Sequence, residues 1–197
     1  LVGDEDIKGE DKWLGGELGA DGMIYGVSGS AKSILKIDPT TDEVTLVGHN
    51  VKGVPCSQRR GAFKWLRGAR ARNGDTFGVP SNADCILRIS KEGDVFTFGD
   101  RELLRGFWKW HGGILAPNGN LYACPCNSDR VLKIVPDTLE ISLVGEAHAG
   151  KNKWYGALLG HDGCMYCVPN CSRHVLRFDT VTETTSLLGD LPEGGWK

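Results

Sequence analysis

The sequence predicts an all-β fold assembled from four tandem repeats, and three observations support this prediction. A Lys-Trp pair begins at Lys12, Lys64, Lys109 and Lys153, so that successive pairs are 52, 45 and 44 residues apart. A turn pair recurs with the same spacings, as Asp21-Gly22, Asn73-Gly74, Asn118-Gly119 and Asp162-Gly163. Short runs rich in Thr, Val, Ile and Leu separate the glycines. Self-similarity with a period in the forties is typical of repeat architectures.

Each repeat contains four strand-like segments, which are clearest in the third repeat. The first segment is 112–116, and it ends at the Asn118-Gly119 pair, which allows the positive backbone angles of a tight hairpin turn. The other three segments are 120–125, 130–135 and 140–145. Proline, aspartate and glycine separate them, so each strand meets the next through turn residues, as in an antiparallel sheet.

The other repeats supply matching segments. The third segments lie at 33–38, 85–90 and 174–179, and the fourth at 43–48, 94–99 and 184–189. Two residue types coincide in all four third segments, leucine at Leu35, Leu87, Leu132 and Leu176, and a base at Lys36, Arg88, Lys133 and Arg177. Neighbouring residues of a strand point to opposite faces. Since both faces also carry apolar residues, we expect each sheet to be covered on both sides.

Four short antiparallel strands in a unit of about forty-five residues describe the blade of a β-propeller. We therefore predict a β-propeller of four-stranded antiparallel blades, with four repeats visible as part of a larger ring. The expected division is a tail of a preceding blade at 1–11, blades at 12–63, 64–108, 109–152 and 153–195, and the start of a further repeat at 196–197. A closed four-bladed ring is the alternative.

The repeated motif residues are expected to have structural roles. The first strand of each blade should lie innermost, where glycines such as Gly112 and Gly113 let backbones approach closely. The motif tryptophans, Trp13, Trp65, Trp110 and Trp154, should wedge between adjacent blades, with an exposed aromatic contact as the alternative. The turn glycines are Gly22, Gly74, Gly119 and Gly163. A phosphate-binding loop would need a helix after its glycines, whereas strands follow here.

The pattern KW-x-G-G-x-L-A-P-N-G-x-x-Y resembles tandem repeats in proteins of algae and other protists, which are taken to be propeller-like. More distantly, "LAPNGNLY" and "RVLKI" are similar to inner strands of NHL-type and gluconolactonase-like propellers. This resemblance covers nearly the whole chain. Gluconolactonase-like enzymes hold a divalent metal with carboxylate and amide side chains that face the central channel. The matching strands here offer chiefly Glu17, so we expect no metal and no other cofactor.

Cysteine is the most tempting chemical signal, with residues at Cys56, Cys85, Cys124, Cys126, Cys164, Cys167 and Cys171. Cys164 and Cys167 are an odd number of residues apart on an expected strand and so point to opposite faces, which disfavours a zinc cluster with His174. Cys167 also takes the repeat position of the small residues Gly26, Gly78 and Ala123. We interpret it as a small core residue, with disulfides and a metal site as alternatives. Unpaired thiols would favour a reducing compartment.

The second repeat departs from the others by its basic residues. Arg67 stands where the other repeats have Gly15, Gly112 and Gly156, and Arg70 where they have Leu18, Leu115 and Leu159. By strand alternation we expect Arg67 on the face of Trp65 and Ala69, and Arg70 on the opposite face, where the other repeats bury leucine.

A repeat that breaks its own pattern is a reasonable place to look for function. The candidate binding residues for an anionic ligand or an acidic partner are Arg59, Arg60, Arg67, Arg70 and Arg72. The alternative interpretation is a solvated surface, or ion pairs with acids of a neighbouring blade.

Charge and composition narrow the function classes. The net charge of −2 argues against a general nucleic-acid binder, and no apolar run approaches the ~20 residues of a membrane span. The histidines share no pattern typical of a catalytic triad, so no catalytic residue is expected. We expect a soluble, non-enzymatic protein-binding or scaffold module, with another protein or a second copy completing or capping the propeller. The alternative is a propeller enzyme, or a binder of a small anionic or sugar-like ligand, acting at the central channel.

Overall fold

The computed structural model describes residues 10–51, 54–56 and 62–192 of the chain. They form two compact units, residues 1–107 and 108–197, and each is described by itself. The predicted tail of a preceding blade at 1–11 lies mostly outside the described residues, and the predicted start of a further repeat at 196–197 lies wholly outside them. No helix in the described ranges is long and apolar enough to cross a membrane.

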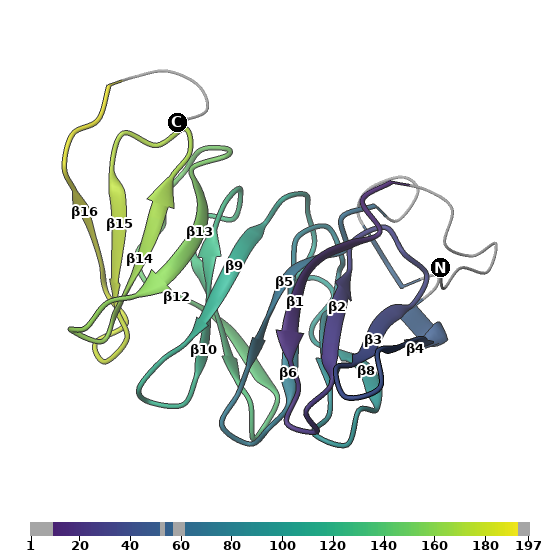
Figure 1. Ribbon diagram of the computed structural model, residues 1–197. Coiled ribbons are helices and arrows are strands. Elements are labelled where there is room, and N and C mark those ends of the chain that lie inside the picture. Colours follow the sequence, from purple (N-terminus) through teal and green to yellow (C-terminus); the bar gives the residue numbers. More distant parts are fainter. Residues whose placement is uncertain (1–9, 52–53, 57–61, 193–197) are drawn as a thin grey trace. The chain divides into compact units, whose positions relative to one another are not determined.

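The first unit contains two four-stranded antiparallel sheets (Figure 1). The first sheet runs in chain order through β1 (Trp13–Leu18), β2 (Ile24–Ser28), β3 (Ile34–Asp38) and β4 (Glu43–Val47). After a short 3-10 turn, η2 (His49–Val51), the second sheet runs through β5 (Trp65–Arg70), β6 (Thr76–Pro80), β7 (Ile86–Ile89) and β8 (Val95–Phe98). Each strand pairs with its neighbour in the chain, as the alternation of strand and turn residues predicts.

The second unit repeats this plan. The third sheet consists of β9 (Trp110–Leu115), β10 (Leu121–Pro125), β11 (Val131–Val135) and β12 (Glu140–Val144). The fourth sheet consists of β13 (Trp154–Leu159), β14 (Cys164–Pro169), β15 (Val175–Asp179) and β16 (Thr185–Leu188). The turn glycines between the first two strands of the sheets all have positive φ angles of 77–95°, which glycine adopts without a steric penalty: Gly22, Gly74, Gly119 and Gly163.

Within each unit the two sheets pack face to face. In the first unit, Tyr25, Val27 and Ile34 of the first sheet share a core with Trp65 and other residues of the second sheet. In the second unit, the third and fourth sheets share a core in the same way, with Tyr122 and Cys124 on one side. Three motif tryptophans, Trp65, Trp110 and Trp154, are at most 2% exposed, whereas Trp13 is partly exposed.

Within each unit, the Lys-Trp pair of the later sheet joins that sheet to the earlier one. Each tryptophan indole N–H donates to a carbonyl twenty residues further along its own repeat, as in the 2.8 Å bond from Trp154 to His174. The preceding lysine reaches back to the earlier sheet: the Lys153 ammonium donates to the Cys126 and Ser128 carbonyl oxygens, at 2.9 Å each. In the first unit Lys64 donates to the Gly29 and Ala31 carbonyl oxygens in the same way. These bonds give the pairs at Lys64 and Lys153 a structural role at the interface between two sheets.

The first strand of every sheet carries a β-bulge. In β5, Trp65 pairs with Pro80, but the next pair is Gly68 with Gly78, so β5 has one more residue than its partner. This extra residue corrects our expectation about faces. Directly opposite residues of an antiparallel pair share a face, and Arg70 pairs with Thr76. Arg70 therefore shares a face with Trp65, and Ala69 lies on the other face, because the bulge inverts the alternation.

Candidate binding surface on the second sheet

The bulge gives Arg67 an unusual backbone conformation. Its φ angle is 65°, and the equivalent residues in the other three sheets are glycines with positive φ angles, Gly15, Gly112 and Gly156. A residue with a side chain in this left-handed region carries a strain of roughly 1 kcal/mol or more, which glycine avoids. Three repeats therefore use the residue that the bulge favours, and the second repeat does not.

The Arg67 side chain is exposed and forms no hydrogen bond or ion pair with the described part of the chain. It lies beside the first sheet: the position of a Cβ atom on Gly15 would be 3.1 Å from the Cα atom of Arg67. Gly15 must consequently stay small for Arg67 to occupy this place. The guanidinium keeps its five N–H donors available for a ligand.

Arg70 lies at the end of the same strand and is also exposed. One of its terminal nitrogens donates to the Gly19 carbonyl oxygen at 3.3 Å. Our expectation that the other repeats bury a leucine here is wrong, since Leu18 is 51% exposed, Leu159 is 41% exposed and Leu115 is only partly buried. The position is at a strand end that water reaches, so Arg70 remains hydrated and needs no buried counter-ion.

Glu17 is the acidic residue of this region. It lies on β1, and a Cβ atom on Gly68 would be 3.3 Å from the Cβ atom of Glu17, so the side chain packs against β5. Burial raises the pKa of the Glu17 carboxyl, while the charge of Arg70 acts in the opposite direction. The half-buried carboxyl thus lies near the exposed guanidinium group of Arg70. Such groups bind carboxylates and phosphates through paired, charge-assisted hydrogen bonds.

The remaining basic candidates are not part of one observed cluster. Arg72 is exposed in the turn after β5. Arg59 and Arg60 lie outside the described residues. Lys64, by contrast, is 4% exposed, and burial lowers its pKa to about 8. Because its ammonium group is bonded to backbone carbonyls, Lys64 holds the two sheets together rather than offering charge to a ligand.

The cysteines were considered as a second candidate site. All seven are present as thiols, and among the described residues no group of three His, Cys, Asp or Glu side chains could hold a metal ion. Cys167 is fully buried and pairs with Ala157 and Leu176, in the register of the small residues of the other sheets. Burial raises the pKa of the Cys124 thiol, which keeps it in the unreactive protonated form.

A cavity of about 440 Å³ lies beside the fourth sheet, lined by residues that include His148, Lys151, Trp154, Cys171 and Leu187. Its buried cation does not face a ligand, because the Lys153 ammonium donates to three backbone carbonyls. The His148 ring is bonded to the Thr185 hydroxyl at 2.7 Å. The cavity is therefore a weaker candidate than the two exposed arginines.

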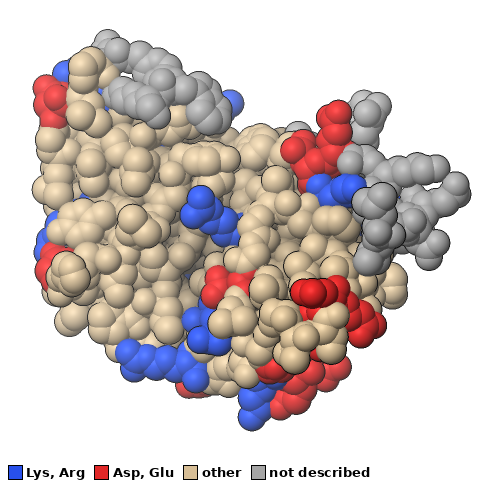
Figure 2. Space-filling view, viewed as in Figure 1, with Lys and Arg blue, Asp and Glu red and all other residues tan. Residues whose placement is uncertain are grey.

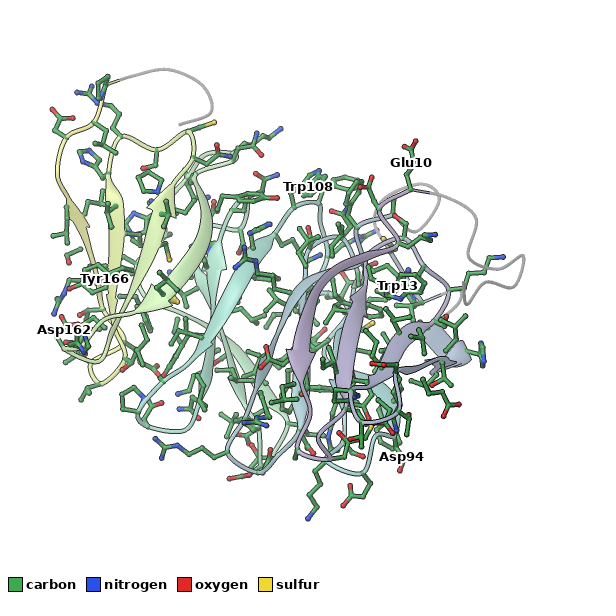
Figure 3. All side chains as sticks on the ribbon, viewed as in Figure 1. Glu10, Trp13, Asp94, Trp108, Asp162 and Tyr166 are labelled. Atoms are coloured by element: carbon green, nitrogen blue, oxygen red, sulfur yellow. The ribbon has the colours of Figure 1, made fainter. Side chains whose placement is uncertain are left out.

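Our reading of the sequence missed a polar network at the hairpin turns. In the fourth sheet the Tyr166 hydroxyl donates to Asp162 at 2.9 Å, and Arg177 donates to the same carboxylate oxygen at 3.3 Å. Figure 3 shows Asp162 and Tyr166 together at one end of this sheet. The basic residues of the third strands occupy equivalent positions in all four repeats, so part of this network was visible in the sequence. The contact between these bases and the tyrosines of the second strands was not predicted. Figure 2 shows that most of the displayed surface is neither acidic nor basic. Clusters of charged side chains on this surface are therefore small and lie apart from one another.

No family model and no curated protein matches the sequence. The structure is similar to several solved proteins. One is a catalytically inactive virginiamycin B lyase from Staphylococcus aureus with quinupristin, with a TM-score of 0.71 and 18% identity over 93% of this chain and 58% of that chain. Another is the hydrazine synthase of Kuenenia stuttgartiensis, with a TM-score of 0.66 and 14% identity over 96% of this chain and 53% of that chain.

A third is an auxiliary nutrient binding protein from Bacteroides ovatus, with a TM-score of 0.62 and 14% identity over 94% of this chain and 44% of that chain. The chain thus spans between two fifths and three fifths of the length of these proteins. At such identities the similarity concerns the fold alone. The structural neighbours are β-propeller proteins, and the prediction of an all-β propeller built from four-stranded antiparallel blades is confirmed.

Proposed function

We propose that this chain is a non-enzymatic, protein-binding β-propeller module whose second blade holds an acidic segment of a partner protein. The observation that carries the proposal is Arg67. It occupies a left-handed backbone position that the three sister repeats fill with glycine, and its guanidinium is exposed without a bond to the described chain. Strain at a site with no internal contact to maintain it points to a role outside the molecule.

Arg70 supports the same proposal. It replaces a leucine that is exposed or partly buried in the sister repeats, and its hydrogen bond to Gly19 is long at 3.3 Å. Two arginines three residues apart on one strand suit a row of carboxylates better than a single small ligand. The proposal also keeps the resemblance to the KWxGGxLAPNGxxY tandem-repeat proteins of algae and protists as its family assignment.

The experiment measures binding of a fluorescently labelled oligoglutamate peptide by anisotropy. We expect Arg67→Gly, which restores the residue of the sister repeats, to weaken binding by about tenfold, the effect of one close charge pair. Arg70→Leu should weaken it in the same direction. Raised salt should weaken binding to the unmodified chain because the contact is ionic.

Arg105→Gly is the matched control, since it removes one exposed arginine whose partner is Glu102 on the same loop. It should leave peptide binding unchanged. If inorganic phosphate displaces the peptide stoichiometrically, the surface is a site for small anions instead. If Arg67→Gly binds the peptide as well as the unmodified chain does, the proposed role of the second blade is wrong.

A further inference from the structure

One face of the fourth sheet is exposed although the equivalent faces of other sheets are buried. Leu158 is 72% exposed, whereas its register equivalents Ala69 and Ile114 are 8% exposed each. Val168 is 53% exposed, whereas its equivalent Val27 is fully buried. The fourth sheet therefore presents to solvent a surface that has the residue types of an inter-sheet core.

The first sheet exposes the opposite kind of face. Trp13 is partly exposed, whereas its equivalents Trp65 and Trp154 are at most 2% exposed. On the same face, Leu18 is 51% exposed and Ile24 is 36% exposed. Exposed apolar patches of this kind mark surfaces that bind other proteins.

These two faces correspond to the two sides of the interfaces already seen inside the units. In both units the earlier sheet contributes its tyrosine face, with Tyr25 or Tyr122, and the later sheet contributes its tryptophan face, with Trp65 or Trp154. The fourth sheet exposes a tyrosine face, with Tyr166, and the first sheet exposes a tryptophan face. The two exposed surfaces are consequently of complementary types.

A polar contact accompanies the apolar one between the third and fourth sheets. The Tyr122 hydroxyl donates to a carboxylate oxygen of Glu183 at 2.9 Å, and the Lys133 ammonium donates to the same oxygen at 2.6 Å. Glu183 is the left-handed residue of the turn between β15 and β16, with a φ angle of 56°. The turn of the later sheet thus places an acid on the tyrosine–base pair of the earlier sheet.

The fourth sheet has the same pair, and among the described residues no acid of another sheet is bonded to it. Arg177 uses its Nε–H on Tyr166 and one terminal N–H on Asp162, and both Arg177 and Asp162 are about one third or more exposed, at 33% and 43%. A guanidinium has five N–H donors, so three remain. In the first sheet, the turn residue equivalent to Glu183 is Asp42, with a φ angle of 59°; it is exposed and forms no hydrogen bond or ion pair with the described chain.

We propose that the exposed tyrosine face of the fourth sheet binds the tryptophan face of the first sheet of a second copy, with Asp42 of that copy bonded to Arg177. The contact is heterologous, since it joins two different surfaces of identical chains. It uses none of the residues assigned to the acidic-partner surface, so it stands or falls independently of the proposed function.

The test is the molar mass of the full chain in solution, measured by light scattering over a concentration series. The unmodified chain should self-associate with increasing concentration. Leu158→Asp should abolish association because it places a charge on the apolar face. Arg177→Glu and Asp42→Lys should each weaken association by about tenfold or more, as a lost close charge pair does. An equimolar mixture of these two charge variants should recover association. Each contact between unlike variants then pairs opposite charges at positions 177 and 42.

Leu187→Asp is the matched control, since Leu187 is 45% exposed but lies on the other face of the fourth sheet. It should leave association unchanged, as should Arg67→Gly. A chain that stays monomeric throughout the series overturns the proposal. So does association that survives Leu158→Asp, or a mixture of charge variants that associates no better than either alone. Arg177 is partly exposed and the other substituted residues are exposed, and circular dichroism verifies that each variant is folded.

Discussion

The third and fourth sheets carry the same tyrosine–base pair but differ in what lies over it. In the third sheet, Tyr122 is 1% exposed, and Lys133 is bonded to Glu183 of the fourth sheet. In the fourth sheet, Tyr166 and Arg177 are bonded to each other and to Asp162 of their own hairpin. The same repeat motif therefore forms a buried interface between sheets in one case and an exposed surface in the other. A covering sheet buries the tyrosine in both units, since Tyr25 and Tyr122 are each 1% exposed. The hairpin residue bonded to the tyrosine differs, because Asn118 of the third sheet stands where the fourth sheet has Asp162.

The pKa of Lys133 is affected by this interface between the third and fourth sheets. It is raised, chiefly because the ammonium donates a hydrogen bond to the Glu183 carboxylate. The pKa of Tyr122 is raised as well, chiefly by burial. In the fourth sheet the lowered pKa belongs to Asp162, at about 2, because the Cys164 backbone N–H donates to its carboxylate. The same set of positions thus stabilises a contact between sheets in one case and a hairpin turn in the other.

The largest expected effect comes from removing a tryptophan on each kind of face. Trp154→Ala should reduce the free energy of unfolding by about 3–5 kcal/mol, because Trp154 fills the core between the third and fourth sheets. Trp13→Ala should cost roughly 1–2 kcal/mol, because its side chain is only partly buried. Urea unfolding followed by circular dichroism measures both values. Equal losses would contradict the distinction between joined and exposed faces.

The next prediction removes the hydroxyl groups of the two tyrosines. Tyr122→Phe leaves the half-buried Glu183 carboxylate with one donor fewer and should cost about 1–2 kcal/mol. Tyr166→Phe should cost about 0.5 kcal/mol or less, because water replaces the exposed hydrogen bond to Asp162. A double-mutant cycle of Tyr122→Phe with Glu183→Gln checks that the larger loss arises from this pair. Additive effects in the cycle would show that the contact contributes nothing.

Substitutions at the bulge position should change the free energy of unfolding in opposite directions in the second and fourth sheets. Arg67→Gly should raise the free energy of unfolding by about 1 kcal/mol, because it relieves the left-handed strain of a residue with a side chain. Gly156→Ala in the fourth sheet should lower it by a similar amount, since the φ angle of Gly156 is 92° and no neighbouring atom obstructs a Cβ there. Thermal and urea unfolding measure both changes. A loss of stability in Arg67→Gly would show that Arg67 has a structural role.

A smaller effect is expected at the position of small residues in the second strand. Cys167→Ala reproduces Ala123 of the third sheet, and it should cost about 1 kcal/mol because it removes one buried sulfur atom. Addition of a chelator should leave the melting temperature of the unmodified chain unchanged. Differential scanning calorimetry with and without chelator provides the measurement. A large fall with chelator would replace the packing interpretation by a metal site.

The smallest expected effect concerns pH. Burial lowers the pKa of His148, and the charge of Lys153 adds to this, whereas Glu146 acts in the opposite direction. The folded chain therefore binds this proton less tightly than the unfolded chain, whose histidine pKa is about 6.5. Stability should consequently fall as the pH is lowered through 6.5 towards the folded pKa. His148→Gln should lose less stability between pH 7 and pH 5 than the unmodified chain does, as measured by urea unfolding at each pH.

Much of the fold was predictable because its determinants are local. The third strand of the third repeat was expected at 130–135 and is Val131–Val135, since turn residues delimit it on both sides. The bulge was not expected, and it inverted the predicted face of Arg70. In a strand of six residues, the alternation of apolar and polar residues is too short to show where one extra residue has been inserted. In retrospect the glycines at Gly15, Gly112 and Gly156 were the signal, since a positive φ angle recurs at each.

The candidate site was predictable only in part. The substitution of arginine for glycine and leucine was evident from the repeats, whereas the strain at Arg67 and the neighbouring carboxyl of Glu17 came from the structure. The repeat, the strands, their order and the residues that break the pattern could be inferred from the sequence, because these depend on neighbours a few positions away. The packing of the sheets was needed to show which equivalent residues are buried, such as Tyr122, and which are exposed, such as Leu158. Burial depends on the sheet that packs against a face, and that sheet lies some forty residues away in the chain.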